Sequence, residues 1–293
     1  MRRTAGGFKV GNCRAGSAGR TRSAVQGQGR NADRTEMDRN LKAAMVLIVA
    51  VLGFWAWTGG NETLAESSVR EKPLLRAAYA GDVETLKALL AQGANVHEMD
   101  RMGQTALHHA VSLEAVNHNP EGNHVACVQA LLKAGAKADQ RTADGTEAPL
   151  YGAVHNPDMV EALLAAGADA RFGMQHRPAL IAAAYYGGDL CTKATESMRL
   201  LVKAGADVNA QESGGFTALS TAAVYGCPGM VRLLLDSGAQ VDRRMQNGQT
   251  LLEWVKMAQG MHQETLLGAG WKQVHADNWR LLETAAAQAG RAR

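Results

Sequence analysis

Histidines are the residues of this sequence whose type and spacing could most readily support chemistry. His108 and His109 are adjacent, and His118 and His124 follow within the next sixteen residues. Neutral imidazole binds metals and acts as a general base, so one hypothesis is a metal site, or a hydrolase that uses His118, His124 and a carboxylate. However, the sequence contains no phosphate-cradling glycine loop, nucleophile elbow or HExxH motif. We therefore expect no catalytic residues, no metal and no cofactor, and we expect solvated side chains at His118 and His124.

One recurring stretch organises the chain. It is clearest at Leu200–Asn209. There a Leu-Leu pair is followed by one variable residue, a small residue, Gly-Ala, and a turn rich in Asp or Asn. Other copies begin at Leu89, Leu131, Leu163 and Leu234. The glycines of the five copies are 42, 32, 38 and 33 residues apart. Self-similarity at such a period is typical of a repeat protein.

A second signature precedes the glycine in several copies. It reads GQTALHHA at Gly103–Ala110, PALIAAA at Pro178–Ala184 and GFTALSTAA at Gly215–Ala223. It resembles the Thr-Pro-Leu-His-x-Ala-Ala element of ankyrin repeats, whose period is about 33 residues. The resemblance covers Pro73 to Gly270. It implies an all-α ankyrin-repeat solenoid of about five to six helix-turn-helix repeats with short hairpin fingers, preceded by one N-terminal hydrophobic helix.

The residues of the motif agree with this fold. Small Ala-Ala steps let the second helix of each repeat approach the first, and the Leu-Leu pair faces the neighbouring repeat. Glycine after that helix is suited to a left-handed C-cap. No single repeat can bury its own apolar face, so stability depends on repeats and their interfaces. His108 occupies the histidine position of the signature, where the family uses it as a structural hydrogen bonder.

The resemblance also implies which residues contact a partner. In ankyrin folds, two variable positions after the Ala-Ala step face the concave groove, and the hairpin fingers border it. Tyrosine suits binding hot spots because it offers a large area and one polar group. The alternative is that ankyrin helices place aromatic residues here for their own packing. The candidate partner-binding residues are Tyr79, Met102, Gln104, His155, Tyr185, Tyr186, Phe216 and Tyr225, and His176 occupies a further finger position.

The four cysteines show no metal-ligand spacing and no disulfide framework. Cys127 falls on an apolar position of a second helix and is expected to be a core thiol. In the ankyrin register, Cys191 and Cys227 both lie near the turn between the two helices of adjacent repeats. If the domain is exported they could form a disulfide; otherwise they are two unrelated thiols.

Two repeats carry additional residues in that same turn. Leu113–His124 enlarges the second repeat, and Asp189–Ala194 enlarges the fourth. In ankyrin folds this turn lies on the edge opposite the fingers, so both segments are expected to project from one edge. Such insertions often mark a binding face, and surface drift in loops is the alternative.

The net charge of +3 conceals an uneven distribution. Residues 1–42 contain ten Lys or Arg and three Asp or Glu, whereas the remainder contains 21 and 25. The repeats are therefore mildly acidic, which disfavours nucleic acid as a partner. Residues 1–36 show no apolar periodicity and are expected to be disordered, or to precede the true start at Met37. The basic excess lies where a membrane-targeting flank would carry it.

Ala43–Gly60 is uncharged, and its apolar core runs from Ala43 to Trp57 over 15 residues. A signal-peptide core spans about 7–15 residues, and a membrane helix needs about 17–25. Trp55 and Trp57 suit a membrane interface and favour an anchor, whereas Thr63–Ala65 offers a mediocre cleavage site. We favour an uncleaved anchor over a cleaved signal; a buried core helix is a third reading. Either targeting reading places the repeats across the membrane.

Together these features predict a protein-interaction module of bacterial type, anchored in the inner membrane or free in the periplasm. It is expected to be a monomer that binds a protein partner, and it contacts the membrane through Ala43–Gly60. Alternatives are an immunity or inhibitor protein against a toxin or enzyme, a membrane-tethered scaffold, and a hydrolase built on the insertions. We expect the chain to consist of a basic segment at 1–42, an anchor or signal core at 43–60, a linker at 61–72, the repeats at 73–270 and a capping helix at 271–293.

Overall fold

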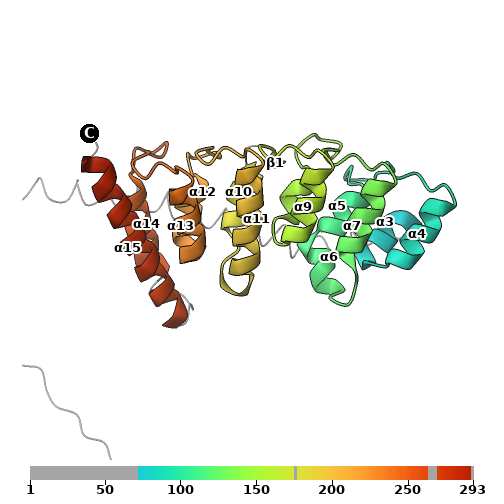
Figure 1. The fold of residues 1–293 in the computed structure, drawn as a ribbon, viewed down its shortest axis with the longest axis horizontal. Helices are drawn as coiled ribbons and strands as arrows, with labels where there is room; N and C mark the ends of the chain where they lie inside the picture. Colours follow the sequence, from blue (N-terminus) through green and yellow to red (C-terminus); the bar gives the residue numbers. More distant parts are fainter. Residues whose placement is uncertain (1–71, 175–176, 263–268, 292–293) are drawn as a thin grey trace, which may run out of the picture. The chain divides into compact units, whose positions relative to one another are not determined.

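The computed structural model describes residues 72–174, 177–262 and 269–291. All of them belong to one of two units of the chain, Asn61–Arg293; the other is Met1–Gly60. The described part is mostly helical (Figure 1). The N-terminal segment, the apolar stretch Ala43–Gly60 and the finger residue His176 lie outside the described residues.

The helices form pairs along the chain, and the two helices of each pair pack against one another. Most of the first helices contain two or more buried alanines, which allow close approach of their neighbours. The pairs are α3 (Pro73–Ala80) with α4 (Val83–Ala91), α5 (Ala106–Val111) with α7 (His124–Lys133), α8 (Pro149–Ala153) with α9 (Pro157–Ala165), α10 (Ala179–Ala184) with α11 (Cys191–Lys203), α12 (Ala218–Val224) with α13 (Pro228–Asp236), and α14 (Leu251–His262) with α15 (Ala269–Arg291).

The pairs stack side by side into two layers. The first helices α3, α5, α8, α10, α12 and α14 contact one another in that order, and so do the second helices α4, α7, α9, α11, α13 and α15. The core lies between the layers, where Leu131, Leu163, Leu201 and Leu234 of the repeated motif are fully buried. The predicted ankyrin-type solenoid is therefore the observed fold, with each pair stabilised by its neighbours.

The motif glycines end the second helices as predicted. Gly135 follows α7 with φ of 93°, a conformation that residues with a β-carbon adopt only at a cost. Its backbone N–H donates to the Leu132 carbonyl, and Ala136 N–H donates to the Leu131 carbonyl, both at 3.0 Å. These bonds satisfy carbonyls at the helix end and turn the chain towards the next hairpin.

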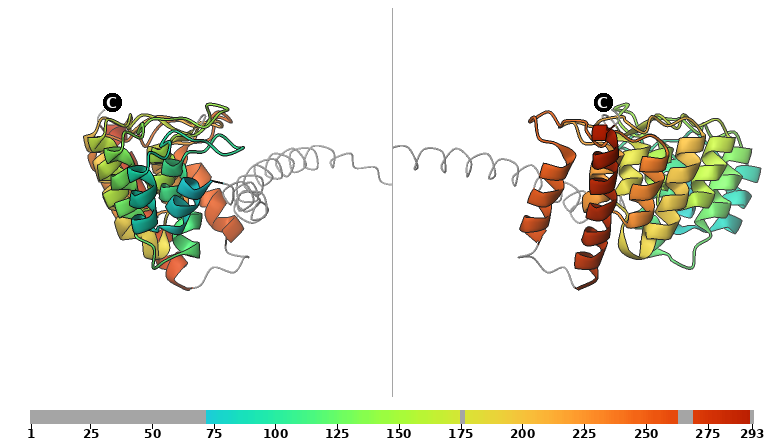
Figure 2. Two further views of the ribbon diagram at one scale, coloured as in Figure 1. Left: turned by 90° about the vertical axis from the view of Figure 1, so that its right-hand side faces the viewer. Right: turned by 60° about the vertical axis from the view of Figure 1, so that its left-hand side comes forward.

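Short hairpins connect consecutive pairs. Met99–Thr105, Gln211–Thr217 and Arg244–Thr250 form isolated antiparallel bridges. The hairpin between α9 and α10 contains β1 (Gly173–Met174) and β2 (Arg177–Pro178), and β1 also bridges to Glu147 of the preceding hairpin. Figures 1 and 2 show these hairpins together along one edge of the helical layers.

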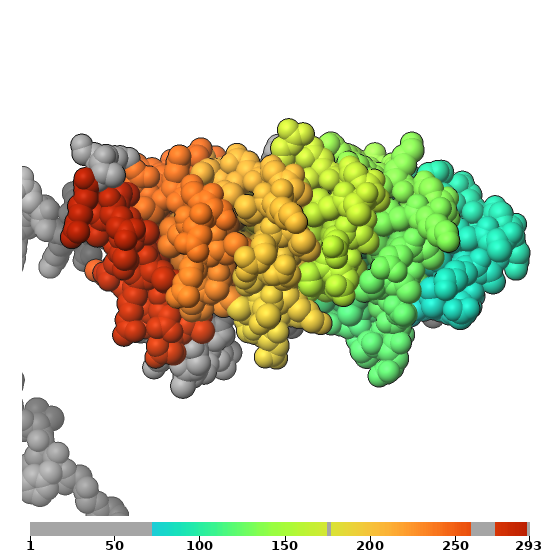
Figure 3. Space-filling model, viewed as in Figure 1, coloured from blue at the N-terminus to red at the C-terminus, as the bar shows by residue number. Residues whose placement is uncertain are grey.

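The two enlarged turns lie on the opposite edge. The first contains a separate helix, α6 (Leu113–His118), between α5 and α7; the second contains the 3-10 helix η1 (Gly188–Leu190) and lengthens α11 to 13 residues. Figure 3 shows both segments protruding from this edge. The sequence predicts additional residues at these turns but not that the first of them is helical.

The final helix covers the end of the row. α15 packs on α13, α12 and α14, and its Leu282 is fully buried while Trp279 is half-buried. The fully buried Asn278 donates its side-chain N–H to the carbonyls of Ala222 and Ala223, at 3.4 and 3.3 Å. These bonds satisfy carbonyls near the C-terminal end of α12. Among the described residues, no helix has the length and apolar character needed to cross a membrane.

Candidate protein-interaction surface

The hairpins meet the first helices along one face of the repeat unit, which we call the inner face. Equivalent hairpin positions, each shortly before the first helix of a repeat, form its upper row. Residues within or just after the first helices form its lower row. The upper row consists of Gln104, Glu147, Arg177 and Phe216, and the lower row of Tyr151, Tyr185, Tyr186 and Tyr225, all half-buried.

An ion pair crosses the centre of the inner face. The Arg177 guanidinium on β2 donates through Nε to the Glu212 carboxylate on the next hairpin, and its Nη1 lies 3.4 Å from the Tyr151 hydroxyl. The Tyr185 hydroxyl donates to the second oxygen of Glu212 at 3.4 Å. The Glu212 side chain is only 8% exposed, so its charge needs these partners. The network fixes polar groups from three repeats in one arrangement.

Aromatic rings extend this network towards the C-terminal repeats. The rings of Tyr185 and Tyr225 have centroids 5.2 Å apart, and those of Phe216 and Trp254 4.9 Å apart. Such pairs contribute about 0.5–1.5 kcal/mol beyond area burial. Trp254 is buried whereas the other three keep an exposed edge. These rings therefore join adjacent repeats and also offer area to a partner.

Burial moves the pKa values of the tyrosine hydroxyls further above neutral pH. It raises the pKa of Tyr186 and of Tyr225 to about 12, and it raises the pKa of Tyr151 as well. At neutral pH these side chains are therefore neutral hydrogen-bond donors and acceptors. The inner face thus combines aromatic area with hydroxyl groups and one internally neutralised ion pair.

The remaining candidates occupy different environments. Met102 is 57% exposed at a hairpin, and Gln104 is half-buried with its backbone N–H donating to Asp100 at 2.9 Å. The Tyr79 hydroxyl lies 3.2 Å from His118 Nδ1, near the edge that carries α6. His155 differs from expectation: it is 4% exposed, and its Nδ1 lies 2.8 Å from the Gly152 carbonyl. We therefore leave His155 out of the inner face.

Four residues of the inner face were not identified from the sequence. Tyr151 lies one helical turn before the expected tyrosine positions, and Arg177 and Glu212 are 35 residues apart in the sequence. Glu147 stands at the hairpin position of Gln104, three residues before the leucine of the repeated signature. Glu147 and Arg177 each stand two residues before the first helix of a repeat, as Gln104 and Phe216 do. This shared position could have identified both residues from the sequence.

The histidines have structural environments. Thr105 N–H donates to His108 Nδ1 at 3.1 Å, which closes a capping box at the start of α5, and burial lowers the pKa of His108 to about 4. His109 Nε2 lies 3.1 Å from the Asp100 carboxylate, where both side chains are buried. His108 therefore acts as the hydrogen bonder that the resemblance implies.

The two insertion histidines do not meet around a carboxylate. His118 Nδ1 lies 3.0 Å from the Glu114 carbonyl, and His124 Nε2 lies 3.2 Å from the Asn119 carbonyl. In the described part of the chain, no group of three His, Cys, Asp or Glu side chains could hold a metal ion. His124 is buried at the start of α7 rather than solvated as expected.

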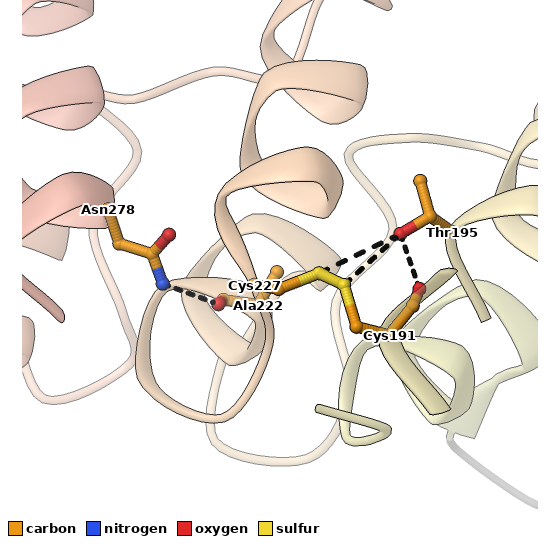
Figure 4. Close-up of a disulfide and its surroundings, with 5 residues drawn as sticks. All are labelled: Cys191, Thr195, Ala222, Cys227 and Asn278. Carbon is orange, nitrogen blue, oxygen red and sulfur yellow. Dashed lines mark hydrogen bonds between the residues drawn. A yellow bond between two sulfur atoms is a disulfide. The ribbon is translucent and has the colours of Figure 1, made fainter. Parts of the chain in front are cut away.

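A disulfide in the structure joins Cys191, at the start of α11, to Cys227, the N-cap residue of α13 (Figure 4). The Thr195 hydroxyl donates to the Cys191 carbonyl at 2.7 Å and lies 3.8 Å from the Cys227 sulfur. Cys127 is a buried free thiol whose pKa is raised to about 11 by burial. Cys127 is therefore the core thiol that its position predicts.

Comparison with known proteins identifies the repeats. The family model described as Ankyrin repeats (3 copies) matches residues 54–142, 74–174, 114–212 and 150–245. The chain is similar to the putative ankyrin repeat protein YahD of Escherichia coli, with 30% identity over 61% of this chain and 86% of that protein. It is also 34% identical to an L-asparaginase of Dirofilaria immitis over 57% of this chain.

The matches to two longer relatives cover only part of those proteins. The chain spans 26% of the asparaginase and 39% of the mouse B-cell lymphoma 3 protein homolog, with which it is 31% identical over 62% of its own length. The chain therefore spans less than half the length of these two relatives.

Solved structures share the fold. An ankyrin repeat domain from Acinetobacter baumannii matches with a TM-score of 0.55 and 25% identity, over 74% of this chain and 98% of that domain. A chain from the complex of a predatory endopeptidase of Bdellovibrio bacteriovorus with an immunity protein matches with a TM-score of 0.55 and 23% identity, over 73% and 97%. With its family match, repeat spacing and stacked helix pairs, this chain belongs to the ankyrin-repeat family.

Proposed function

We propose that this protein is a non-enzymatic interaction module that binds a protein partner through the inner face and the neighbouring hairpins. Ankyrin repeats imply protein–protein interaction. The proposal adds that the partner docks on the inner face. The observation that carries the proposal is the inner-face network, in which Arg177, Glu212 and tyrosines from several repeats are fixed before any partner arrives. Preorganised aromatic and arginine groups are typical of binding hot spots.

We further propose that the repeats, five to six in number, lie on the far side of a membrane. The proposed anchor is Ala43–Gly60, preceded by the basic segment 1–42 and followed by the linker 61–72. The placement of Cys191 beside Cys227 supports this location, because stable disulfides are rare in reducing cytosol and frequent in exported proteins. The module would then be an inner-membrane protein with periplasmic repeats, or a soluble periplasmic protein after cleavage.

One more specific role has an observation in its favour. A structural neighbour comes from a complex between an endopeptidase and an immunity protein, and 97% of that neighbour is covered. An immunity or inhibitor protein is therefore the second candidate for this chain. It requires stoichiometric capture of one enzyme or toxin and loss of that enzyme's activity on binding.

Affinity capture tests the proposed function. The bait is the full chain, purified from membranes in mild detergent and mixed with envelope extract of the source organism. The test variant carries Tyr185→Ala and Tyr225→Ala. We expect one dominant captured protein and a loss of affinity of more than about 2 kcal/mol, roughly 30-fold in Kd, with the variant.

Two controls separate binding from packing. Tyr185→Phe with Tyr225→Phe keeps both rings but removes the Tyr185 hydrogen bond to Glu212, so the affinity that it retains measures the contribution of the rings. Thermal unfolding of every variant reports on the fold. If the alanine variant unfolds cooperatively at a much lower temperature, the tyrosines are packing residues; if it is folded and still binds, the inner face is not the site.

A further inference from the structure

Glu147 lies at the centre of the inner face beside the ion pair. Glu147 pairs with Met174 across an antiparallel bridge, and Met174 pairs with Arg177 within the β1–β2 hairpin. Residues directly opposite one another in an antiparallel ladder project their side chains to the same face. Glu147 and Arg177 therefore project to the same face of this small ribbon, two strand spacings or about 10 Å apart.

The two side chains differ in their partners. Arg177 is bound by Glu212 and reaches Tyr151. Among the residues that the structure describes, none donates a hydrogen bond to the Glu147 carboxylate or forms an ion pair with it. Its charged neighbour on the same hairpin is Asp144, which repels it.

The arginines of the neighbouring hairpins already have other contacts. Arg141 lies over the Phe172 ring at 3.5 Å from its centroid, and Arg171 donates to Asp169 at 3.0 Å. Glu147 is also half-buried, and burial, followed by the charge of Asp144, raises its pKa to about 7. A carboxyl group held in this way destabilises the free protein when it ionises.

We propose that Glu147 binds a basic side chain, lysine or arginine, of the protein partner that docks on the inner face. This inference rests on the proposed function and adds the chemistry of the partner to it. A cationic group placed beside Glu147 would supply the counter-charge that none of the described residues provides there. A charge-assisted hydrogen bond in such a site is stronger than a neutral one.

Selection from random dodecapeptides displayed on phage, with the full chain immobilised, provides the probe. Peptides are selected in parallel on the wild type, on Glu147→Gln, and on Glu283→Gln, a matched change at an exposed carboxylate of α15. We expect wild-type and Glu283→Gln selections to share peptides with a lysine or arginine at one fixed position. Those peptides should bind Glu147→Gln at least about tenfold more weakly.

A stability measurement separates binding from a structural role. If Glu147 is held for a partner, Glu147→Gln should raise the urea midpoint of the free protein at pH 8; a structural carboxylate would lower it. The inference fails if tyrosine-dependent peptides are selected but show no basic position or bind Glu147→Gln equally, and the proposed function then stands. If no selected peptide depends on Tyr185 and Tyr225, both are overturned.

Discussion

Removal of the disulfide between Cys191 and Cys227 tests whether the repeat unit is suited to an oxidising compartment. The bond ties the start of α11 to the N-cap of α13, and the two cysteines are 36 residues apart. It therefore joins two neighbouring second-layer helices on the edge opposite the hairpins. The variant carries Cys191→Ser and Cys227→Ser.

The expected magnitude follows from the length of the closed loop. Chain-entropy treatment of a loop of this size gives about 4 kcal/mol of stabilisation at 25 °C. In a folded unit of this size, 1 kcal/mol corresponds to about 2–4 °C in Tm. We therefore expect the variant to unfold about 10 °C below the oxidised wild type.

Thermal and urea unfolding with and without reductant provide the assay. Reductant should lower the stability of the wild type to that of the double variant and leave the variant unchanged. Cys127→Ser is the matched control: it places a hydroxyl in the core and costs about 1–3 kcal/mol, but the loss on reduction remains. Thiol labelling of the protein from its native host should leave Cys191 and Cys227 unmodified until reduction.

Either of two results would contradict a stabilising disulfide in the native protein. If reductant changes the stability of the wild type by less than about 1 kcal/mol, the bond does not constrain the unfolded chain as the loop length implies. If Cys191 and Cys227 are labelled in native protein without reduction, the pairing does not form in the host, and its support for an exported location is lost.

Two further predictions concern stability. Burial lowers the pKa of His108 and of His155 to about 4, below the usual 6.5, so the unfolded chain binds more protons between those values. The stability that these neutral imidazoles contribute is fully present above about pH 6.5 and is lost as pH falls to about 4, by at most roughly 3 kcal/mol each. The urea midpoint should therefore be lower at pH 5 than at pH 7.5, and the difference should be smaller in His155→Gln. Asn278→Ala removes two buried hydrogen bonds to α12 and should cost about 1–3 kcal/mol, with faster amide exchange in α15; unchanged exchange would mean that the α15 contacts hold without them.

The repeat fold was predictable because its signals are local. Each glycine cap, such as Gly135, and each buried leucine four residues before it belongs to one short motif, and the motif recurs at a near-constant period. Neighbouring copies bury their apolar faces by stacking on one another. The location of the insertions was predictable for the same reason, whereas the helix α6 within the first of them lacked a clear periodic signal.

The inner face was predictable only in outline. The tyrosine positions follow from the helical register, but the contacts of Tyr185 with Glu212 and Tyr225 depend on how the repeats stack. His155 shows the limit of register: α8 ends at Ala153, and the chain folds back so that the imidazole contacts the Gly152 carbonyl inside the protein. The Arg177–Glu212 pair required knowledge of which hairpins are adjacent.

Site-specific photo-crosslinking in living cells tests whether the partner binds at the inner face. A photoreactive amino acid replaces Met102, which is exposed beside the inner face, or Lys203, which is exposed on the second-helix layer at the end of α11. We predict one crosslinked protein from position 102 and none from position 203, with the product lost when Tyr185→Ala and Tyr225→Ala are added. Equal products from both positions, or a product from position 203 alone, would contradict binding at the inner face.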